Sequence, residues 1–417
     1  MKNHALFFLL ALALSGGAQA QTTPAAPATP AVNAFGAPVV APGVTAEEGA
    51  PNADKARIEI SGQVMLDAIY DMKRVDPAWN ATLRPSTIPV NCPGDAGCGK
   101  DGETIMSVRQ SRLGFKGFIP TSMGEVTALF DFDLFDSGGG NTHSRVLHAW
   151  GEIGQFGAGQ TETLFMDLDV FPNTLDYWGP SGMVFIRNPQ MRFTPINRDG
   201  MKVSFSLEAP NSAIDTGKVD LVDPALAAGI TSHNRYPDLV GALRLDRDWG
   251  HFQAAGILRQ VGFETPTNPN SEPSGEKTGY GLNLSGQYNT IGKDRVVGQL
   301  VFGQAIASYM NDGGSDLAPN ASLQAEAVKS VGWFVYYDHY WNAKWSSSAG
   351  YSEHRQSNTD GQTADAFKKG SYASANLLFY PVKNVTTGAE FLWGQRENKD
   401  GATGDDQRIQ FSAKFTF

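Results

Sequence analysis

Hydrophobic and polar residues alternate through most of the sequence after residue 56. In residues 57–71, RIEISGQVMLDAIYD, most apolar side chains fall on even numbers and most polar ones on odd numbers. The same alternation recurs in residues 125–135 (EVTALFDFDLF), in 200–208 (GMKVSFSLE) and in the last ten residues, RIQFSAKFTF. A period of two is typical of β-strands. The pattern therefore predicts strands with one apolar face and one polar face.

The length and spacing of these segments predict a barrel in a membrane. Windows of roughly ten residues match strands that cross a bilayer. Short connections such as PTSM (120–123), DWG (248–250) and YPVK (380–383) alternate with long ones at 72–103, 209–235, 264–277 and 309–326. A soluble β-sandwich would turn its polar face outward, whereas here the apolar face is continuous and the polar face carries charges that need water. We expect an all-β fold, a transmembrane antiparallel β-barrel of about sixteen strands over residues 57–417.

The first residues have the features of a secretory signal. Lys2 precedes the apolar run ALFFLLALAL, and Ala18-Gln19-Ala20 forms a small-residue cleavage site, so we expect Sec export and cleavage after Ala20. The run is shorter than the about 20 residues of a spanning helix, which disfavours an internal anchor. Residues 21–56 are rich in Ala and Pro, and we expect a disordered periplasmic segment there.

The composition supports a membrane barrel and argues against nucleic acid as a partner. The sequence contains 46 glycines, 11% aromatic and only 18% charged residues, which is unusual for a soluble enzyme of this length. Mean hydropathy is −0.27, which alone would indicate a soluble protein, but in a barrel half of each strand faces water. The formal charge is −10, the wrong sign for binding nucleic acid.

The two cysteines are predicted to form a local disulfide. Cys92 and Cys98 lie in NCPGDAGCGK and are the only cysteines of the chain. A close pair separated by Pro and Gly in an exported protein is typical of a bridge that stiffens a loop. A reactive thiol pair or a metal site would need more ligands than this loop supplies.

Four motifs resemble the DcaP-like porins of Gram-negative outer membranes. They are QSRLGFKG (110–117), HAWGEIGQFGAGQT (148–161), MDLDVFPNTLDYWGPSGMVFIRNPQMRFT (166–194) and ASANLLFYPV (373–382). The resemblance implies a sixteen-stranded barrel, a homotrimer, and uptake of small anionic, often dicarboxylic, solutes. It also implies that residues 162–185 fold into the lumen as a constriction loop. The founding type of the family has a coiled coil before its barrel, whereas residues 21–55 here are rich in Pro and Ala, so we expect no such stalk.

The last residue is predicted to matter for barrel closure. Ile409, Phe411, Ala413, Phe415 and Phe417 share one face, so the final strand stops on an apolar residue. In lipid an unpaired strand edge costs several kcal/mol, and we expect this strand to pair with the first. The ending also resembles the signature by which the barrel-assembly machinery recognises outer-membrane barrels.

Basic residues on the polar face are the candidates for anion selectivity: Arg112, Lys116, Arg187, Arg192 and Arg145. The short turn at 120–123 places Arg112 across from Asp131 on the next strand, so the alternative for Arg112 is an ion pair within the wall. Pro189 cannot donate to a ladder and predicts a bulge that would turn both Arg187 and Arg192 inward. The alternation does not decide whether Arg145 points inward or outward. Arg109 falls on the lipid-facing positions near the loop end of its strand, where its side chain would contact lipopolysaccharide instead of the lumen.

Acidic residues of the constriction loop are expected to oppose these cations: Glu162, Asp167, Asp169 and Asp176. A calcium site needs six or more oxygens, and no spaced ligand set follows Asp167 and Asp169. We therefore expect neither a metal nor a cofactor.

The sequence predicts a channel and no enzyme. It contains no G-x-S-x-G, H-E-x-x-H or Walker motif. We expect passive diffusion of small hydrophilic solutes with a preference for anions, in contact with outer-membrane lipid and lipopolysaccharide. The alternatives are a non-selective general porin, a hydrolase built on the barrel wall, or an adhesin barrel with a filled interior.

Overall fold

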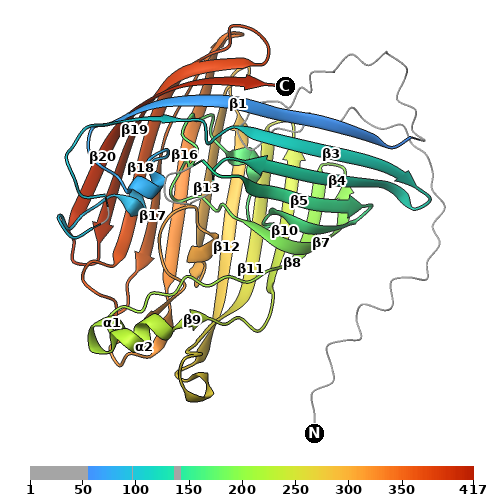
Figure 1. Cartoon of the computed structure of the whole chain (residues 1–417). Coiled ribbons are helices and arrows are strands. Elements are labelled where there is room, and N and C mark those ends of the chain that lie inside the picture. Colours follow the sequence, from blue (N-terminus) through green and yellow to red (C-terminus); the bar gives the residue numbers. More distant parts are fainter. Residues whose placement is uncertain (1–54, 96, 136–141) are drawn as a thin grey trace.

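The computed structural model describes residues 55–95, 97–135 and 142–417. The predicted signal peptide, residues 1–20, and all but the last two residues of the predicted periplasmic segment, 21–56, lie outside the described residues. Within the described residues the architecture is a single curved antiparallel sheet that closes on itself (Figure 1).

One large sheet forms the wall, and a small separate hairpin and short helices lie in the loops. The strands of the large sheet are β1 (Arg57–Asp71), β2 (Glu103–Ser107), β3 (Arg112–Thr121), β4 (Gly124–Asp133), β5 (Arg145–Ile153), β6 (Phe156–Glu162), β7 (Arg187–Arg198), β8 (Met201–Glu208), β9 (Thr231–Ser232), β10 (Asp238–Arg247), β11 (Gly250–Glu264), β12 (Gly275–Asn289), β13 (Arg295–Gln304), β16 (Lys329–Asn342), β17 (Trp345–Ser357), β18 (Phe367–Phe379), β19 (Val385–Asn398) and β20 (Thr403–Thr416). The hairpin consists of β14 (Leu317–Pro319) and β15 (Ala325–Ala327).

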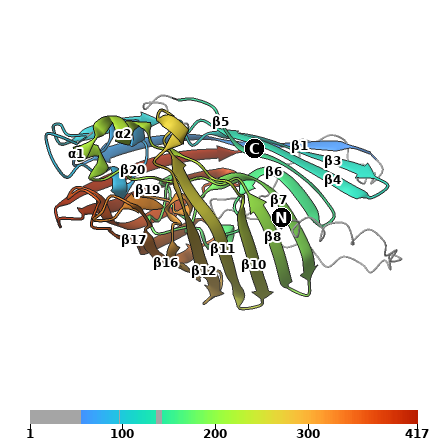
Figure 2. The ribbon, with the colours of Figure 1, turned by 90° about the horizontal axis from the view of Figure 1, so that it is seen from below.

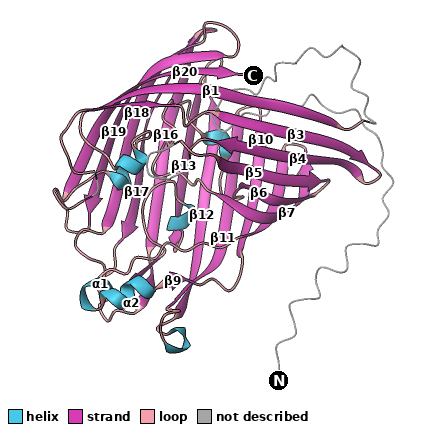
Figure 3. Cartoon of the chain, in the orientation of Figure 1, coloured by secondary structure: helices cyan, strands magenta, loops and turns pink. Residues whose placement is uncertain are grey.

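The helices are all short (Figure 3). They are α1 (Val219–Val222), α2 (Pro224–Gly229) and the 3-10 turns η1 (Pro77–Trp79), η2 (Pro85–Thr87), η3 (Leu168–Val170), η4 (Pro269–Ser271) and η5 (Ala307–Tyr309). Among the described residues, no helix has the length and apolar character needed to cross a membrane.

The wall is a closed barrel of sixteen strands, as the sequence predicts. The sheet contains eighteen named strands. However, β2 and β3 pair in succession with one side of β1 and act as one strand, and β9 is a two-residue addition to the end of β11. β20 pairs with β1 along residues 63–71, which closes the barrel.

The two faces of each strand follow the alternation of the sequence. In β1 the side chains of Ile58, Val64 and Leu66 are exposed on the outer face, whereas Asp67 and Asp71 are buried on the inner face. A barrel whose outer face is apolar and whose inner face is polar suits lipid outside and water or polar loops inside. The short turns lie at one end of the barrel and the long loops at the other.

The last residue of the sequence takes part in barrel closure. Phe417 and Gly62 exchange two backbone hydrogen bonds of 3.0 Å, which continue the β1–β20 ladder. An added Cβ at Gly62 would come within 2.6 Å of the Arg112 carbonyl oxygen and within 2.7 Å of the ring carbon Cζ of Phe417, whose ring lies against the backbone of Gly62. Glycine is therefore required at position 62, and Phe417 fills the space above it.

Deleting Phe417 is expected to reduce assembly of the barrel in the outer membrane severely. The deletion removes two ladder hydrogen bonds at the seam and exposes backbone groups where no water is available, at several kcal/mol for each unsatisfied group in lipid. The measurement is the amount of heat-modifiable protein in isolated outer membranes. A deletion of residues 25–50 is the control, and equal assembly of the two variants would contradict the prediction.

Long loops fill part of the barrel interior. Residues 72–102, 163–186 and 305–328 contribute apolar side chains to one core, among them Leu83, Phe165 and Met310. These side chains pack on inward-facing wall residues such as Val301 and Tyr336. The loops are therefore part of the lumen structure and set how much of the interior stays open to water.

Candidate functional site

The loop between β6 and β7, residues 163–186, contacts the inner wall on several sides. Its backbone N–H at Leu164 donates to Glu208 of β8 (2.9 Å), and that at Gly182 donates to Ser352 of β17 (2.8 Å). The N–H groups of Leu175 and Asp176 both donate to Glu390 of β19, at 2.7 and 2.8 Å. A segment bonded to β8, β17 and β19 lies across the interior of the barrel.

Asp176 connects this loop to a second one. Its carboxylate accepts hydrogen bonds from the Thr82 hydroxyl (2.9 Å) and the Leu83 N–H (3.1 Å) of loop 72–102. It also accepts from the Gly179 N–H (3.1 Å) and the Tyr372 hydroxyl (3.2 Å). With a relative exposure of 1%, Asp176 does not face the open lumen, contrary to the expectation that it opposes the basic residues there. It holds two loops together instead.

Residues 305–328 complete this assembly, which we call the three-loop core. Asp312 forms an ion pair with Arg84 of loop 72–102 (3.0 Å). Asn311 and Trp178 exchange two hydrogen bonds, both 2.7 Å, between the third loop and loop 163–186. Each loop is thus bonded to the other two, and moving one requires the others to give way.

Three of the predicted arginines gather with acidic partners on the inner face of β3 to β7, in what we call the lumen cluster. Arg112 pairs with Asp131 through bonds of 2.7 and 2.8 Å from its Nε atom. The expected ion pair is therefore present, although the strand register sets Arg112 opposite Asp133 and the bond to Asp131 is diagonal. Asp133 instead pairs with Arg145 (2.6 Å) and accepts from the Tyr177 hydroxyl (2.8 Å).

Glu162 forms the second half of the lumen cluster. It is the last residue of β6 and accepts from Arg187 (3.2 Å), and the His148 ring nitrogen Nε2 lies 3.2 Å from the same carboxylate oxygen. The other ring nitrogen of His148 is hydrogen-bonded to the Thr161 hydroxyl (3.0 Å). Arg112, Arg145 and Arg187 thus each have a carboxylate beside them, and the cluster has little net charge while His148 is neutral.

The inward direction of Arg187 and Arg192 does not depend on a bulge at Pro189, and that prediction is wrong. Pairing of β6 with β7 runs unbroken through Gln160 and Pro189. The register shift of β7 lies between Phe193 and Ile196. Pro189 is tolerated because the N–H that it lacks would point towards β8, whose ladder with β7 begins only at Gln190. Arg187 reaches Glu162 from the first position of the strand.

Arg192 lies in a different place, at a cavity of about 900 Å³ below loop 163–186. Its guanidinium donates to the Gln190 side chain (2.9 Å) and to the Glu162 carbonyl (2.7 Å), and lies over the Trp150 ring. Among the described residues, no carboxylate forms an ion pair with Arg192. We call this space, on the short-turn side of the loop, the basic cavity, although carboxylates line it as well, Asp246 and Asp248 among them.

Lys202 and Arg244 line the basic cavity as well, and neither is among the basic residues predicted from the sequence. They are cross-strand partners on β8 and β10. Lys202 has no carboxylate within ion-pair distance in the described part of the chain, whereas Arg244 is bonded to Asp169 (2.7 Å) and Asp167 (3.2 Å). The alternation in GMKVSFSLE already placed Lys202 on the polar face, which was the one signal available.

The acidic residues of the loop are divided among three environments. Asp167 is fully buried between Arg244, His251 (2.8 Å) and the Ser285 hydroxyl (2.8 Å). Asp169 forms an ion pair with the same Arg244 as Asp167 does. Glu162 belongs to the lumen cluster, and Asp176 belongs to the three-loop core. They do not form one acidic rim.

Two other basic residues lie apart from the basic cavity. Lys116 is on the inner face of β3, exposed, with its ammonium 5.0 Å from the Phe118 ring centre. Arg109 was assigned to the lipid-facing parity, and this is wrong: it lies between β2 and β3, where the alternation is interrupted, and it is 2% exposed. Its guanidinium lies 4.4 Å from the centre of the Phe135 ring.

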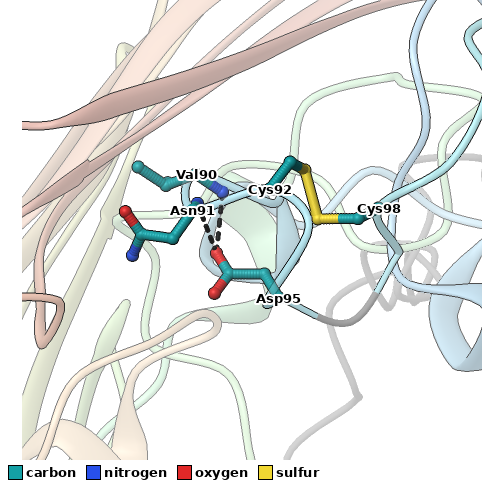
Figure 4. Close-up of a disulfide and its surroundings, with 5 residues drawn as sticks. All are labelled: Val90, Asn91, Cys92, Asp95 and Cys98. Carbon is teal, nitrogen blue, oxygen red and sulfur yellow. Dashed lines mark hydrogen bonds between the residues drawn. A yellow bond between two sulfur atoms is a disulfide. The ribbon is translucent and has the colours of Figure 1, made fainter.

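Cys92 and Cys98 form the predicted disulfide in loop 72–102 (Figure 4). Within the bridge, the Asp95 carboxylate accepts from the N–H groups of Val90 (2.8 Å) and Asn91 (2.9 Å). Partial burial tends to raise the pKa of Asp95, but the hydrogen bonds from these two N–H groups lower it by more. The pKa of Asp95 therefore lies below its ordinary value. The bridge joins two residues of the loop that are six positions apart in the sequence.

Among the described residues, no group of three or more His, Cys, Asp and Glu side chains is arranged to hold a metal ion. The chemistry that this interior offers is charge and hydrogen bonding along an aqueous path.

A closed barrel of sixteen strands with a polar interior and an apolar exterior defines a channel of the outer-membrane porin class. The chain matches the DcaP outer membrane protein family over residues 43–417. It belongs to that family, and its location is the outer membrane of a Gram-negative bacterium. The short turns therefore face the periplasm and the long loops the outside.

Solved structures share the fold at low sequence identity. The outer membrane channel DcaP of Acinetobacter baumannii is 20% identical with a TM-score of 0.74, over 87% of this chain and 97% of that one. An anion-selective porin from Comamonas acidovorans is 11% identical with a TM-score of 0.56, over 87% and 100%. OmpT of Vibrio cholerae in a trimer form is 12% identical with a TM-score of 0.53, over 87% and 100%. No curated protein matches the chain.

Proposed function

We propose that the chain is a porin for passive diffusion of small hydrophilic solutes that favours anions, with dicarboxylates among them. The observation that supports an anion preference is that three cations of the basic cavity, Arg192, Lys202 and Arg247, form no ion pair with a carboxylate of the described residues. A cation already bonded to a carboxylate attracts a passing anion weakly, because the two charges cancel at short range. Arg112, Arg145 and Arg187 are therefore expected to contribute less to selectivity than the cations of the basic cavity.

The net charge of the whole chain has little influence on a solute in the lumen. At physiological salt the Debye length is about 8 Å, so carboxylates on distant loops are screened. A unit charge 7 Å from a solute charge contributes roughly 0.6 kcal/mol at the dielectric constant of water and about 2.4 kcal/mol at an effective value of 20. Two cations acting on both ends of a dicarboxylate add these contributions, which would make a weak binding step.

Loop 163–186 is proposed to form the constriction. The support is its path from β8 to β17 and β19, together with the lumen cluster beside it. A solute that enters from outside would pass the three-loop core, then the lumen cluster, and then the basic cavity before it reaches the periplasm. The remaining proposed partners are lipopolysaccharide and lipid around the wall, the assembly machinery at Phe417, and two further copies of the chain.

Replacing Arg192 and Lys202 together by glutamine is expected to shift selectivity towards cations. The double variant removes two of the three cations without an ion pair and keeps polar side chains in the basic cavity, while Arg247 stays bonded to the backbone carbonyls of Gly200 and Asp246. The measurement is the reversal potential of the reconstituted channel under a salt gradient, with current block by a small dicarboxylate as a second readout. We expect an anion-to-cation permeability ratio lower by roughly threefold or more, the factor for about 0.6 kcal/mol.

Glutamine substitutions at Lys344 and Lys383 provide the matched control, because both lysines are exposed in periplasmic turns. That variant should behave like the wild type. The proposal of anion preference fails if the wild-type channel is cation-selective, or if the double variant has the same selectivity as the wild type. The remaining function would then be a general diffusion porin.

A further inference from the structure

Positive charges gather on the outer surface of the barrel at the extracellular ends of β16, β17 and β18. Arg355 of β17 and Lys369 of β18 are directly opposite each other in the ladder, on the outer face. Lys329 of β16 lies diagonally across from Arg355, opposite Ser357. Lys368 is the neighbour of Lys369 at the start of β18. We call these four basic residues the outer basic band, and Figure 2 shows β16 and β17 side by side in the wall that carries it.

The carboxylates that pair with the outer basic band are fewer than its cations. Its two lysines on β18 share the single carboxylate of Glu397, at 2.7 and 3.1 Å. Arg355 has one contact of 3.4 Å with Glu353. Lys329 is exposed and forms no ion pair with a carboxylate of the described residues. The band therefore keeps an excess of positive charge over its acidic partners.

Two other charged sites at the same rim are balanced one to one. Lys73, which follows β1, pairs with Asp405 of β20 at 2.6 Å, and Arg235, which precedes β10, pairs with Glu276 of β12 at 2.7 Å. In the outer basic band, by contrast, two cations occupy directly opposite positions of adjacent strands. Like charges in that arrangement destabilise a strand pair. An anion bound between the two side chains would remove this repulsion.

The wall directly below the outer basic band is apolar and aromatic. On β16 the outer-facing side chains that follow Lys329 towards the periplasm are Val331, Trp333 and Val335. The two valines have relative exposures of 44% and 51%. Trp333 and Tyr351 of β17 have ring centres 5.4 Å apart. Because Trp and Tyr favour the boundary between lipid and water, the cations lie at the level of lipid head groups.

We propose that the outer basic band binds a phosphate group of lipopolysaccharide, the lipid of the outer leaflet around the barrel. This gives a defined site to the lipopolysaccharide contact on which it rests in the proposed function. A guanidinium can donate two parallel hydrogen bonds to a phosphate, whereas an ammonium acts as a point charge. Arg355 would therefore orient the phosphate, with Lys329 on one side and Lys369 on the other. A lipid is favoured over free phosphate because its acyl chains would also cover the apolar wall below.

Replacing Arg355 and Lys369 together by glutamine tests the site. The measurement is a titration of the purified protein in mild detergent with diphosphoryl lipid A, followed by native mass spectrometry, and heat-modifiable migration checks folding. We expect a dissociation constant at least tenfold higher than that of the wild type, because each cation near an anionic lipid contributes to binding. Lys344→Gln with Lys383→Gln is the matched control, since it removes the same charge from exposed periplasmic turns and should leave the dissociation constant unchanged. Equal dissociation constants for the wild type and the double variant, or an equal rise in the control, would overturn the proposal.

Two further probes test whether the occupant is a phosphorylated lipid. Lipid A without its phosphate groups should bind the wild type at least tenfold more weakly than diphosphoryl lipid A, and equal binding contradicts a role for the phosphate. An excess of inorganic phosphate at constant ionic strength should leave lipid A bound, and displacement contradicts a lipid site.

The reversal potential of the same double variant separates this proposal from the anion preference. The outer basic band lies outside the lumen, so the variant should lose lipid binding and keep the selectivity of the wild type. If the anion preference fails instead, the wild-type channel is not anion-selective, whereas its binding of diphosphoryl lipid A stays intact.

Discussion

Replacing Asp176 by alanine should enlarge the channel, with a single-channel conductance raised roughly twofold or more, because conductance follows the open cross-section. Asp176 is the acceptor that holds loop 72–102 against loop 163–186, through Thr82 and Leu83. Without it, donors of both loops and the Tyr372 hydroxyl lose their partner inside the barrel. Each buried donor left unpaired costs about 1–3 kcal/mol. The packed three-loop core therefore loses most of its free-energy advantage over a state in which the loops lie further apart.

The measurement is current through single channels in a planar bilayer, together with uptake of solutes of increasing size into proteoliposomes. Asp176→Asn should lie between the wild type and Asp176→Ala, because the amide oxygen still accepts from Leu83 and Thr82. Asp360→Ala removes an exposed carboxylate from an outer loop and serves as the control. Unchanged conductance in Asp176→Ala would show that the three-loop core does not limit the open area.

The barrel could be predicted from the sequence because its cause is local. Alternation along β1 and β20 specifies an inside and an outside residue by residue, and the two environments, lipid and water, differ enough to make the pattern clear. The ion pair of Arg112 with Asp131 followed from the same reasoning, since a short turn places the two side chains on adjacent strands. The alternation of apolar and polar residues and the length of the turn were sufficient to predict contacts between side chains on neighbouring strands.

The interior could not be predicted in the same way, because its contacts join residues far apart in the chain. Asp176 meets Thr82 and Tyr372, and no short-range pattern relates these three positions. An acidic residue in an inserted loop looks like a lumen residue in the sequence, and only the packing of the other loops shows that it is buried.

The basic cavity shows an intermediate case. The alternation placed Lys202 on the polar face, so its direction was available, whereas the inward direction of Arg192 was predicted from a bulge at Pro189 that the strand does not contain. What the sequence did not show was which cations have acidic partners. Arg187 finds Glu162 and Arg244 finds Asp167 and Asp169 through the path of loop 163–186, whereas Arg192 and Lys202 do not. The proposed anion selectivity depends on that difference.

Exchanging Glu162 for glutamine should make the channel more selective for anions, the opposite of the expected effect at Arg192 and Lys202. Glu162 is the acidic partner of Arg187 and lies 3.2 Å from both Arg187 and the His148 ring. Glutamine keeps the size and can still accept from Arg187, but it removes one negative charge from the lumen cluster. A solute anion about 7 Å away would gain roughly 0.6 kcal/mol at the dielectric constant of water, about a threefold rise in the permeability ratio, and more where the lumen is narrow.

The reversal potential under a salt gradient measures this change, and conductance measured beside it shows whether the aperture has stayed the same. Glu125→Gln is the control, because Glu125 is an exposed carboxylate paired with Arg57 at the periplasmic rim, where salt screens its charge. A change at Glu162 that equals the change at Glu125 would mean that solutes do not pass the lumen cluster. A shift of Glu162→Gln towards cations would mean that the loop rearranges when its charge is lost. A shift towards anions with unchanged conductance would place the permeation path beside Arg187, because only a charge that lies along the path changes selectivity without changing the aperture.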